Sequence, residues 1–561
     1  MSPYDAGVPT TLAPYPDRTL LDYLTDLARD RANHPALLFK GTTLTWSGLE
    51  RLSDACAAAF HALGVKRGDR VALLLPNCPQ FSIAQFAAWK LGAIVAPLNP
   101  IYTEHELEGP LREHGVETIV TLTRFYHRVK RVQPRTPVRR VIATNIKEHF
   151  PAALKVLFTL LREKRDGDRI SLAPGDHDFA HLLLVNRGRR GPSAAVRAAD
   201  PAVLLMSGGT TGTPKGVLGT HGAYVMAGLQ VRAWNASVHD ADPSKDVIFV
   251  PLPLFHVYAN VGSQAFGLIH GAPLALVPNP RDLSDLIATT RRVKPAFFNG
   301  VPTLYIGLLN HPDVQKGKVD FKSIKICFSG AAPLLADTKQ RFEALTGARI
   351  VEGYSLTEAM MAACVNPVKG ENKLGSVGMA LPDVQVRVFD GEEGTRVMPT
   401  NEVGEIALSG PQLMVGYWNR PEETAVVLRD HVDERGTSRW LHTGDLGYLD
   451  EDGYVFIVDR KKDLIKTSGF QVWPREIEEV LAKHPSIAEV GVAGVSDPTK
   501  GEAVKAWVVL RAGTSASEEE LRAFCREQLA PYKVPAKIEF RKDLPKTMVG
   551  KVLRRALRDG G

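Results

Sequence analysis

The segment from Ser207 to Gly216 (SGGTTGTPKG) could bind phosphate, because it follows the apolar run AVLLM and combines glycines, hydroxyl groups and one lysine. Glycines let backbone N–H groups close around phosphate oxygens, hydroxyl groups donate further hydrogen bonds, and Lys215 adds positive charge. The pattern is not a Walker A loop, since Pro214 stands where that loop has glycine. A ligand-free surface loop is the alternative. The candidate phosphate contacts are Ser207, Gly208, Gly209, Thr210, Thr211, Gly212 and Lys215.

Two carboxylates further along the chain suit a nucleotide and its metal ion. Glu358 ends the motif EGYSLTE, and Mg²⁺ commonly joins one or two carboxylates to the phosphates of a substrate. Asp445, in the motif TGD, can accept hydrogen bonds from two neighbouring hydroxyl groups, such as those of a ribose. In isolation, Glu358 would more often belong to a capped helix end and Asp445 to a turn.

Five motifs, taken in their order along the chain, resemble the adenylate-forming superfamily, which contains acyl-CoA synthetases, 4-coumarate:CoA ligases, beetle luciferases and peptide-synthetase adenylation domains. The motifs are SGGTTGTPKG at Ser207, GYSLTE at Gly353, WLHTGDLG at Trp440, DRKKDLIKTSG at Asp459 and PKTMVGK at Pro545. The resemblance covers nearly the whole chain and favours bacterial medium- and long-chain fatty acid:CoA ligases. It implies that the protein binds ATP, Mg²⁺ and coenzyme A. It also implies that a carboxylic acid becomes an acyl-adenylate with release of pyrophosphate, and that the acyl group then passes to coenzyme A.

The resemblance assigns the catalytic roles to a few residues. Lys551 would bridge the attacking carboxylate and the α-phosphate, and Lys462 would be the hinge about which a C-terminal domain swings between the two steps. Glu358 and Thr210 would hold Mg²⁺, and His256 would lie beside the acyl site without transferring a proton. Without the resemblance, DRKKD is a solvated linker and the region around Lys551 is a basic tail.

The nucleotide and coenzyme A contacts also follow from the resemblance. Tyr354 would stack on adenine, Thr357 would touch the α-phosphate, and Asp445 would bind the ribose. Gly469 would lie where the coenzyme A arm passes close to the backbone. The further expected contacts are Gly330, Ala331, Ala332, Glu352, Gly353, Arg460 and Lys466.

The acyl pocket should be built from residues 255–262, 298–304 and 354–363. These ranges are rich in apolar and small side chains, namely Val257, Tyr258, Ala259, Val261, Val301, Met360, Met361 and Ala362. An apolar acid fits such a lining, and a medium- or long-chain fatty acid is preferred. An aryl acid of the hydroxycinnamate type is the runner-up, and a protein that binds nucleotide or acyl groups without turnover is the alternative from another class.

The elements that must position these residues indicate an α/β protein. From residue 45 to about 120, helical patterns alternate with apolar runs such as RVALLLPN and IVAPLNP, and the same rhythm returns in DVIFVPLPLF, PLALVP, AFFNGVP and IKICFSGAAPL. This alternation predicts two parallel sheets covered by helices, with ligands at the strand ends. Short alternating segments between about 382 and 458 predict a barrel-like antiparallel unit, and a small α+β unit follows. The predicted boundaries are 1–459 for the N-terminal domain, 460–463 for the hinge and 464–561 for a mobile C-terminal domain.

The bulk composition is that of a large globular protein, with 561 residues, 44% hydrophobic, 23% charged and a formal charge of +7. Basic and aromatic residues do not interleave in clusters, so nucleic acid is not an expected partner. The five cysteines lie far apart, which predicts neither disulfides nor zinc. The N-terminus lacks a signal-peptide pattern and no apolar run spans a membrane, so a cytoplasmic location is expected.

One amphipathic segment, residues 149–165, could lie on a membrane surface. It places Leu154, Leu157, Phe158 and Leu161 on one helical face, with basic residues elsewhere. A helix packed on its own domain is the alternative, because most surface helices are amphipathic. The sequence also leaves a homodimer open.

Overall fold

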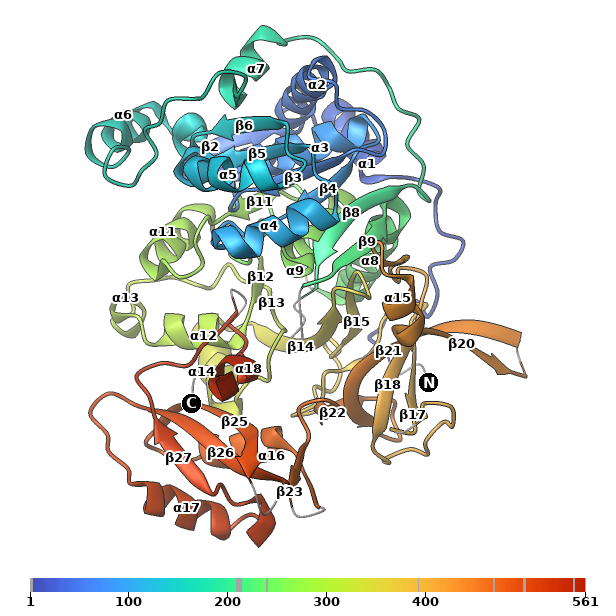
Figure 1. Ribbon diagram of the computed structural model, residues 1–561, viewed down its shortest axis with the longest axis vertical. Helices are drawn as coiled ribbons and strands as arrows, with labels where there is room; N and C mark the ends of the chain where they lie inside the picture. The colour runs from blue at the N-terminus through green and yellow to red at the C-terminus, as the bar shows by residue number, and fades with distance from the viewer. Residues whose placement is uncertain are drawn as a thin grey trace.

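Four β-sheets organise the computed structural model of the chain (Figure 1). The structure describes residues 4–207, 214–238, 241–391, 393–434, 436–467, 470–497, 501–547 and 550–559. Two largely parallel sheets with their helices form the larger part. A barrel-like antiparallel sheet lies beside them, and a small α+β part built from the C-terminal segment lies at the far end of the molecule.

The first sheet has the strand order β19-β9-β8-β4-β3-β5-β6-β7 among the described residues. Its strands are β3 (Arg70–Leu74), β4 (Ile94–Pro97), β5 (Thr118–Leu122), β6 (Arg140–Thr144), β7 (His177–Asp178), β8 (Pro201–Met206), β9 (Gly216–Thr220) and β19 (Gly416–Tyr417). Strands β3 to β8 pair in parallel, and β9 and β19 are antiparallel additions at one edge. Alternate residues of β3 enter two different apolar clusters, so both faces of the sheet are covered.

The second sheet has the order β16-β15-β14-β13-β12-β10-β11-β1-β2 in the described part of the chain. Its strands are β1 (Pro35–Phe39), β2 (Thr42–Thr45), β10 (Ile248–Val250), β11 (Leu274–Leu276), β12 (Phe297–Gly300), β13 (Ile326–Ser329), β14 (Arg349–Leu356), β15 (Met361–Val365) and β16 (Met379–Ala380). Strands β1 and β10 to β14 pair in parallel, whereas β2, β15 and β16 run antiparallel. The hairpin of β1 and β2 was not expected from the sequence.

A helical layer joins the two sheets into one core. Every residue of α3 except Lys90 is buried, because α3 packs on both layers. The Trp89 indole donates to the carbonyl oxygen of Ala202 in the first sheet, and Ser82 donates to Gln264 in the π-helix η5. The helices around this layer are α1 (Leu20–Asp30), α2 (Trp46–Ala62), α3 (Pro79–Lys90), α8 (His221–Trp234), α9 (Val257–Ala259), η5 (Asn260–Ala265) and α10 (Phe266–His270).

Further helices cover the outer faces of both sheets. In β12, Phe297 contacts Phe266 of α10, whereas its neighbour Phe298 contacts Tyr305 and Phe342 on the other face. The outer helices are α4 (Glu104–Glu113), α5 (Tyr126–Val132), α11 (Leu283–Val293), α12 (Pro302–Leu309), α13 (Pro312–Gln315) and α14 (Ala336–Thr346).

The antiparallel sheet follows as the sequence predicts, in the order β17-β18-β21-β20 with β22 paired to β21. Its strands are β17 (Gln385–Phe389), β18 (Gly404–Ser409), β20 (Leu428–Asp433), β21 (Gly436–Leu449) and β22 (Val455–Arg460), and α15 (Pro421–Val427) precedes β20. The mixed α/β architecture with this barrel-like sheet confirms the predicted fold class.

The C-terminal segment has apolar clusters of its own, which begin at Ile465 and share no residue with the main core. Its described strands and helices are β23 (Ile465–Thr467), β24 (Phe470–Val472), β25 (Ile487–Asp497), β26 (Gly501–Leu510), β27 (Lys537–Phe540), α16 (Pro474–Ala482), α17 (Glu518–Arg526) and α18 (Arg554–Asp559). Figure 1 shows these elements grouped below the two large sheets.

The amphipathic segment forms α6 (Ala152–Leu161), which lies at the outer side of the molecule (Figure 1). The helix α7 (Phe179–Val185) follows it along the chain. None of the residues of α6 is buried. Leu154 and Phe158 are half-buried, and Phe158 packs edge-on against Phe150. Leu157 and Leu161, on the same expected face, are exposed together with Val156 and Leu160, so the apolar residues do not form one packed face.

Among the described residues, no helix has both the length and the apolar character needed to cross a bilayer. All five cysteines are buried free thiols.

Candidate active site

A cavity opens where the second sheet meets the helical layer, near the carboxyl ends of β12 and β13. Ligands bind at this edge in parallel α/β sheets. Its lining is mostly apolar and comprises Val231, Trp234, Asn235, Tyr258, Gly262, Phe266, Asn299, Phe328, Ser329, Gly330, Gly353, Ser355, Met361, Ala362, Val365 and Leu381.

The cavity uses only part of the pocket expected from the sequence. Tyr258, Met361 and Ala362 line it, but the other expected side chains are buried elsewhere in the core, namely Val257, Ala259, Val261, Val301 and Met360. Met360 packs against Gly219, where an added Cβ would lie 2.4 Å from its Cε. The cavity wall from α10 was not expected, because this helix is apolar on most sides and shows no single marked face.

Gly262 keeps the cavity open on the side of η5. A Cβ added at Gly262 would lie 2.2 Å from Cε of Met361, so the Met361 side chain occupies the space that glycine leaves. Met361 has a φ of 126°, a backbone conformation that L-residues rarely adopt, which fixes its side chain against η5.

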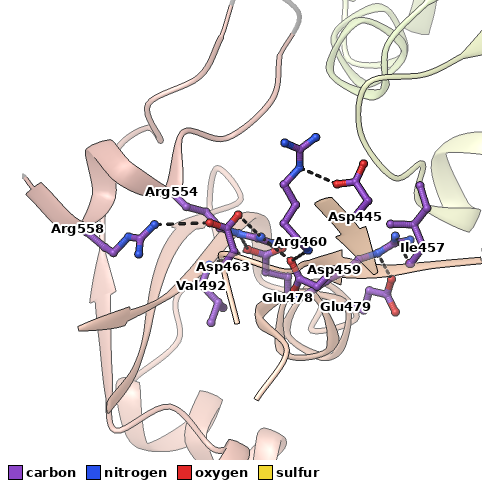
Figure 2. Close-up of polar contacts among 11 residues, drawn as sticks. Asp445, Ile457, Asp459, Arg460, Asp463, Glu478, Glu479, Val492, Arg554 and Arg558 are labelled. Carbon is purple, nitrogen blue, oxygen red and sulfur yellow. Dashed lines mark hydrogen bonds and ion pairs between the residues drawn. The ribbon is translucent and has the colours of Figure 1, made fainter. Parts of the chain in front are cut away.

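A hydrogen-bonded carboxylate, Asp445, lies beside the cavity on β21. Tyr354 donates its hydroxyl to Oδ2 at 2.5 Å. Arg460 places Nε 2.9 Å from Oδ1 (Figure 2). The side chain of Asp445 is only 4% exposed. Each carboxylate oxygen has a second acceptor site, so Asp445 can still receive two hydroxyl groups of a ligand. The structure therefore brings together three residues that the sequence assigned to the nucleotide.

Lys551 lies close enough to this carboxylate for the two groups to interact. Burial, followed by the nearby Arg460 cation, lowers the pKa of Lys551 to about 8, and Asp445 acts in the opposite direction. The loop is held by Thr547, whose backbone N–H donates to the Lys551 carbonyl oxygen at 2.8 Å. Gly550 has a φ of 77°, and a Cβ there would lie 2.2 Å from Oγ1 of Thr303 on α12. The lysine loop thus lies directly against the larger part of the protein.

The base of the phosphate-loop candidate is closed by hydrogen bonds between Ser207 and Lys215. The Ser207 N–H donates to the Lys215 carbonyl oxygen at 2.8 Å, and the Lys215 N–H donates to Ser207 Oγ at 3.2 Å. The Lys215 ammonium forms an ion pair with Glu423 and lies 4.6 Å from the ring centroid of Tyr417. The expected contacts Gly208, Gly209, Thr210, Thr211 and Gly212 lie outside the described residues, as does Gly469.

Tyr417 links this lysine to the metal-ligand candidate. Its hydroxyl donates to Oε1 of Glu358 at 2.9 Å, and burial together with Glu358 raises the pKa of Tyr417 above its ordinary value. Thr357 is buried beside Glu358. Tyr417 and Glu423 were not predicted from the sequence, because neither belongs to a recognisable motif. Tyr417 lies 59 residues after Glu358.

The remaining predicted contacts divide between the cavity and its surroundings. Gly330 and Gly353 line the cavity, and Ala331, with a φ of 68°, turns the chain next to Ala332. Glu352 is buried and accepts the backbone N–H of Leu334 at 3.3 Å. Burial raises the pKa of Glu352.

His256 and two basic residues lie apart from the cavity lining. His256 Nδ1 accepts the Tyr258 backbone N–H at the start of α9, and burial lowers the pKa of His256 to about 4, so the ring is neutral. Lys462 follows β22, and burial lowers the pKa of its ammonium. Lys466 is exposed on β23, where its backbone N–H donates to Glu502.

Two family models match the chain: AMP-binding enzyme over residues 24–418, and AMP-binding enzyme C-terminal domain over residues 476–551. A long-chain-fatty-acid–CoA ligase of Bacillus subtilis (strain 168) is 40% identical, covering 99% of this chain and 97% of the relative. A 4-coumarate–CoA ligase 2 of Oryza sativa subsp. japonica is 35% identical, covering 96% and 92%.

Solved structures resemble the protein over nearly their whole length. The anthranilate CoA ligase AuaEII in complex with anthranoyl-AMP has a TM-score of 0.82 at 26% identity, covering 97% of both chains. ATP-bound MatB from Rhodopseudomonas palustris has a TM-score of 0.80 at 28% identity, covering 97% of this chain and 99% of that one.

Proposed function

Because the chain belongs to the family of AMP-binding enzymes, we propose that it activates a medium- or long-chain fatty acid with ATP and passes the acyl group to coenzyme A. Pyrophosphate leaves in the first step and AMP in the second. The single observation that carries this proposal is the hydrogen-bonded cluster of Tyr354, Asp445 and Arg460 beside an apolar cavity, within electrostatic range of Lys551.

The first step requires a carboxylate to attack a phosphate of like charge. Asp445 would hold the ribose, and Lys551 would place its cation between the acid oxygen and the α-phosphate, where negative charge shifts toward pyrophosphate. Lys215 would add charge at the phosphates and is held near them by Tyr417. The cavity would hold the acyl chain away from water, so that only its carboxylate reaches this cluster.

Glu358 fits a place in a magnesium site. No group of three or more His, Cys, Asp or Glu side chains placed to hold a metal ion occurs among the described residues. Mg²⁺ does not need one, because it commonly takes one or two protein oxygens and fills its shell with phosphate and water. We assign Glu358 and Thr210 as its protein ligands, and Mg²⁺ would supply charge compensation at the phosphates.

The second step requires coenzyme A to reach the same acyl-adenylate. The apolar clusters of the two parts of the chain are separate, and the contact of Gly550 with Thr303 joins parts that share no core. We therefore propose that residues 464–561 rotate as a unit about residues 460–463, with Lys462 as the pivot and Gly469 in the path of coenzyme A.

An aryl acid is the second candidate, and one observation favours it. Asn235 Oδ1 and Ser329 Oγ are buried in the cavity lining, and neither has a hydrogen-bond partner within the described part of the chain. A hydroxylated aryl acid could satisfy such atoms, whereas a saturated chain could not. The similarity to 4-coumarate–CoA ligase 2 and to the anthranilate CoA ligase supports the same candidate.

A turnover panel distinguishes these proposals. The purified protein is given ATP, Mg²⁺ and either saturated fatty acids of graded length, hydroxycinnamic acids or benzoic acids, and released pyrophosphate is measured with and without coenzyme A. We expect release with fatty acids and acyl-CoA only when coenzyme A is present. Release with aryl acids alone would favour the second candidate, and no release with any acid would leave a binding protein without turnover.

We further propose that α6 contacts the inner, anionic face of a membrane, from which a fatty acid could enter. Val156, Leu157, Leu160 and Leu161 are exposed on a helix that carries Lys155 and is followed by the basic residues Arg162, Lys164 and Arg165. This combination suits an anionic lipid surface. This proposal includes the expected cytoplasmic location. Leu160→Glu should lower co-sedimentation with anionic vesicles, whereas Leu374→Glu, at another exposed leucine, should not; equal binding by both variants would contradict it.

A further inference from the structure

Arg554, at the start of α18, contacts acidic side chains on both sides of the proposed hinge (Figure 2). Its Nη1 lies 2.8 Å from Oδ1 of Asp459 and 3.2 Å from Oδ2 of Asp463. Asp459 belongs to β22, before Lys462, whereas Asp463 follows Lys462. One guanidinium group therefore spans the point at which rotation is proposed.

The same guanidinium is also anchored within the C-terminal segment. Nη2 of Arg554 lies 2.8 Å from Oε2 of Glu478 on α16, and Nε donates to Oε1 at 3.2 Å. Glu478 in turn accepts the backbone N–H of Val492 in β25 at 2.8 Å. Arg554 and Glu478 would therefore move together in any rotation of this segment, because both belong to it.

The contact across the hinge is buried, which makes it sensitive to the loss of one partner. The side chains of Asp459 and Asp463 are 2% and 8% exposed, and that of Arg554 is 17% exposed. Asp459 also accepts the Arg475 backbone N–H at 2.8 Å, so α16 is tied to β22 at the same place. Without Arg554, the carboxylates of Asp459, Asp463 and Glu478 would face one another without the cation that now joins them, a costly arrangement away from water.

We propose that Arg554 is a positioning residue that selects the adenylation arrangement of the C-terminal segment by pairing with Asp459. The inference rests on the proposed function, because it requires two arrangements of that segment. Rotation about Lys462 would separate Arg554 from Asp459 but not from Glu478. The pair across the hinge therefore exists in one arrangement only, and it biases the equilibrium toward that arrangement.

The pair of Arg554 and Asp459 can affect catalysis because Arg554 is close to Lys551 in the chain. Lys551 lies three residues earlier in the same segment and reaches the Asp445 cluster only while this segment is docked. The ion pairs of Arg554 are with Asp459, Asp463 and Glu478, and its cation also lowers the pKa of Lys551. Arg554 therefore acts on the first step through the position and charge of Lys551.

The first test separates the two half-reactions in Arg554→Gln. We expect pyrophosphate release in a single turnover to fall about tenfold or more, while acyl-CoA formation from supplied acyl-adenylate stays unchanged or rises. Arg554→Lys should restore part of the first step, since it keeps a cation near Asp459. Equal loss in both half-reactions, or no loss in either, would overturn the proposal.

Glu478→Gln is the matched control, because it changes a partner of Arg554 that lies within the C-terminal segment. It alters both arrangements alike, so the ratio of the two half-reaction rates should stay within about twofold of the unmodified protein. Asp459→Asn should instead reproduce the shift in ratio seen with Arg554→Gln. A shift with Glu478→Gln but not with Asp459→Asn would overturn the role of the pair across the hinge.

A second test needs no catalysis and so separates this inference from the proposed function. The five native cysteines are buried, so cysteines introduced at the exposed Gln315 and Gln528 can carry a pair of fluorescent labels. We expect the labelled protein to show one dominant energy-transfer population and Arg554→Gln to shift molecules into another. An unchanged distribution would overturn the inference, even if the protein proves to be a ligase. A shift would support it, even if the substrate is not a fatty acid.

Discussion

Gly550→Ala tests whether the lysine loop must dock against α12 for the first half-reaction. The substitution costs free energy in two ways. One cost applies in both arrangements of the loop, and the other applies only when the loop is docked. A φ of 77° places Gly550 in the left-handed region, which costs alanine about 1–2 kcal/mol whether or not the loop is docked. The new Cβ would also lie 2.2 Å from Thr303 Oγ1, and this overlap costs roughly 1–3 kcal/mol in the docked arrangement alone.

Only the second cost changes the balance between the two arrangements. A penalty of about 1–3 kcal/mol lowers the ratio of docked to undocked molecules roughly 5- to 150-fold. We therefore expect pyrophosphate release in a single turnover to fall within that range. Acyl-CoA formation from supplied acyl-adenylate should stay within about twofold, because the loop is not docked on Thr303 in that step.

Two variants separate the cost of the overlap with Thr303 from the cost of the backbone conformation. Gly513→Ala is the matched control, since Gly513 has a φ of 79° in the same segment but an added Cβ would meet nothing within 4 Å. It should leave both half-reactions near their original rates. Combining Gly550→Ala with Thr303→Ala removes the overlapping Oγ1 and should recover most of the first half-reaction. No recovery in this double variant, or equal losses in both half-reactions, would refute the docking argument.

Three further predictions concern the cavity and the charged cluster. The pKa of Lys551 is lowered to about 8, so its cation is present below that pH and lost above it. We therefore expect kcat/KM for pyrophosphate release to fall as pH rises through about 8. Lys551→Arg should not show this fall, because arginine keeps its charge. Gly262→Val should displace Met361 and shift the acid panel toward shorter chains, and an unchanged length profile would mean that the chain lies elsewhere. Glu358→Gln should raise the Mg²⁺ concentration needed for half-maximal pyrophosphate release by about tenfold, with the later acyl transfer to coenzyme A unaffected.

The order of motifs predicted the candidate site better than it predicted the contacts within it. Asp445, Tyr354 and Lys551 were named from short patterns, and the structure brings them together. Their contacts were not predictable, because Tyr354 and Asp445 are 91 residues apart and meet only through the packing of two sheets. Tyr417 illustrates the same limit, since an isolated tyrosine in a turn-rich stretch gives no sign that it joins Lys215 to Glu358.

The fold was predictable where apolar runs alternate with helical patterns, and less so where helices are enclosed. The runs that became β3, β10 and β12 are short, apolar and bounded by turn residues, so they indicate buried parallel strands. The helix α8 is buried on most sides and therefore has no distinct face, and its contribution to the cavity wall could not be read from its pattern. For the helix α6, the amphipathic pattern left open a membrane surface and packing on its own domain, and its apolar residues divide between contact and solvent.

The enclosure of α3 between the two sheets has a consequence for how the chain is made. Residues 79–90 leave the ribosome long before residues 260–265, which form η5 and hydrogen-bond to α3. Until η5 arrives, the side of α3 that carries Ser82 and Gln85 stays uncovered, and α3 also carries the apolar Phe81 and Phe86. The nascent chain therefore exposes an apolar surface on α3 for much of its synthesis. We expect chaperones to bind the chain mainly during that interval.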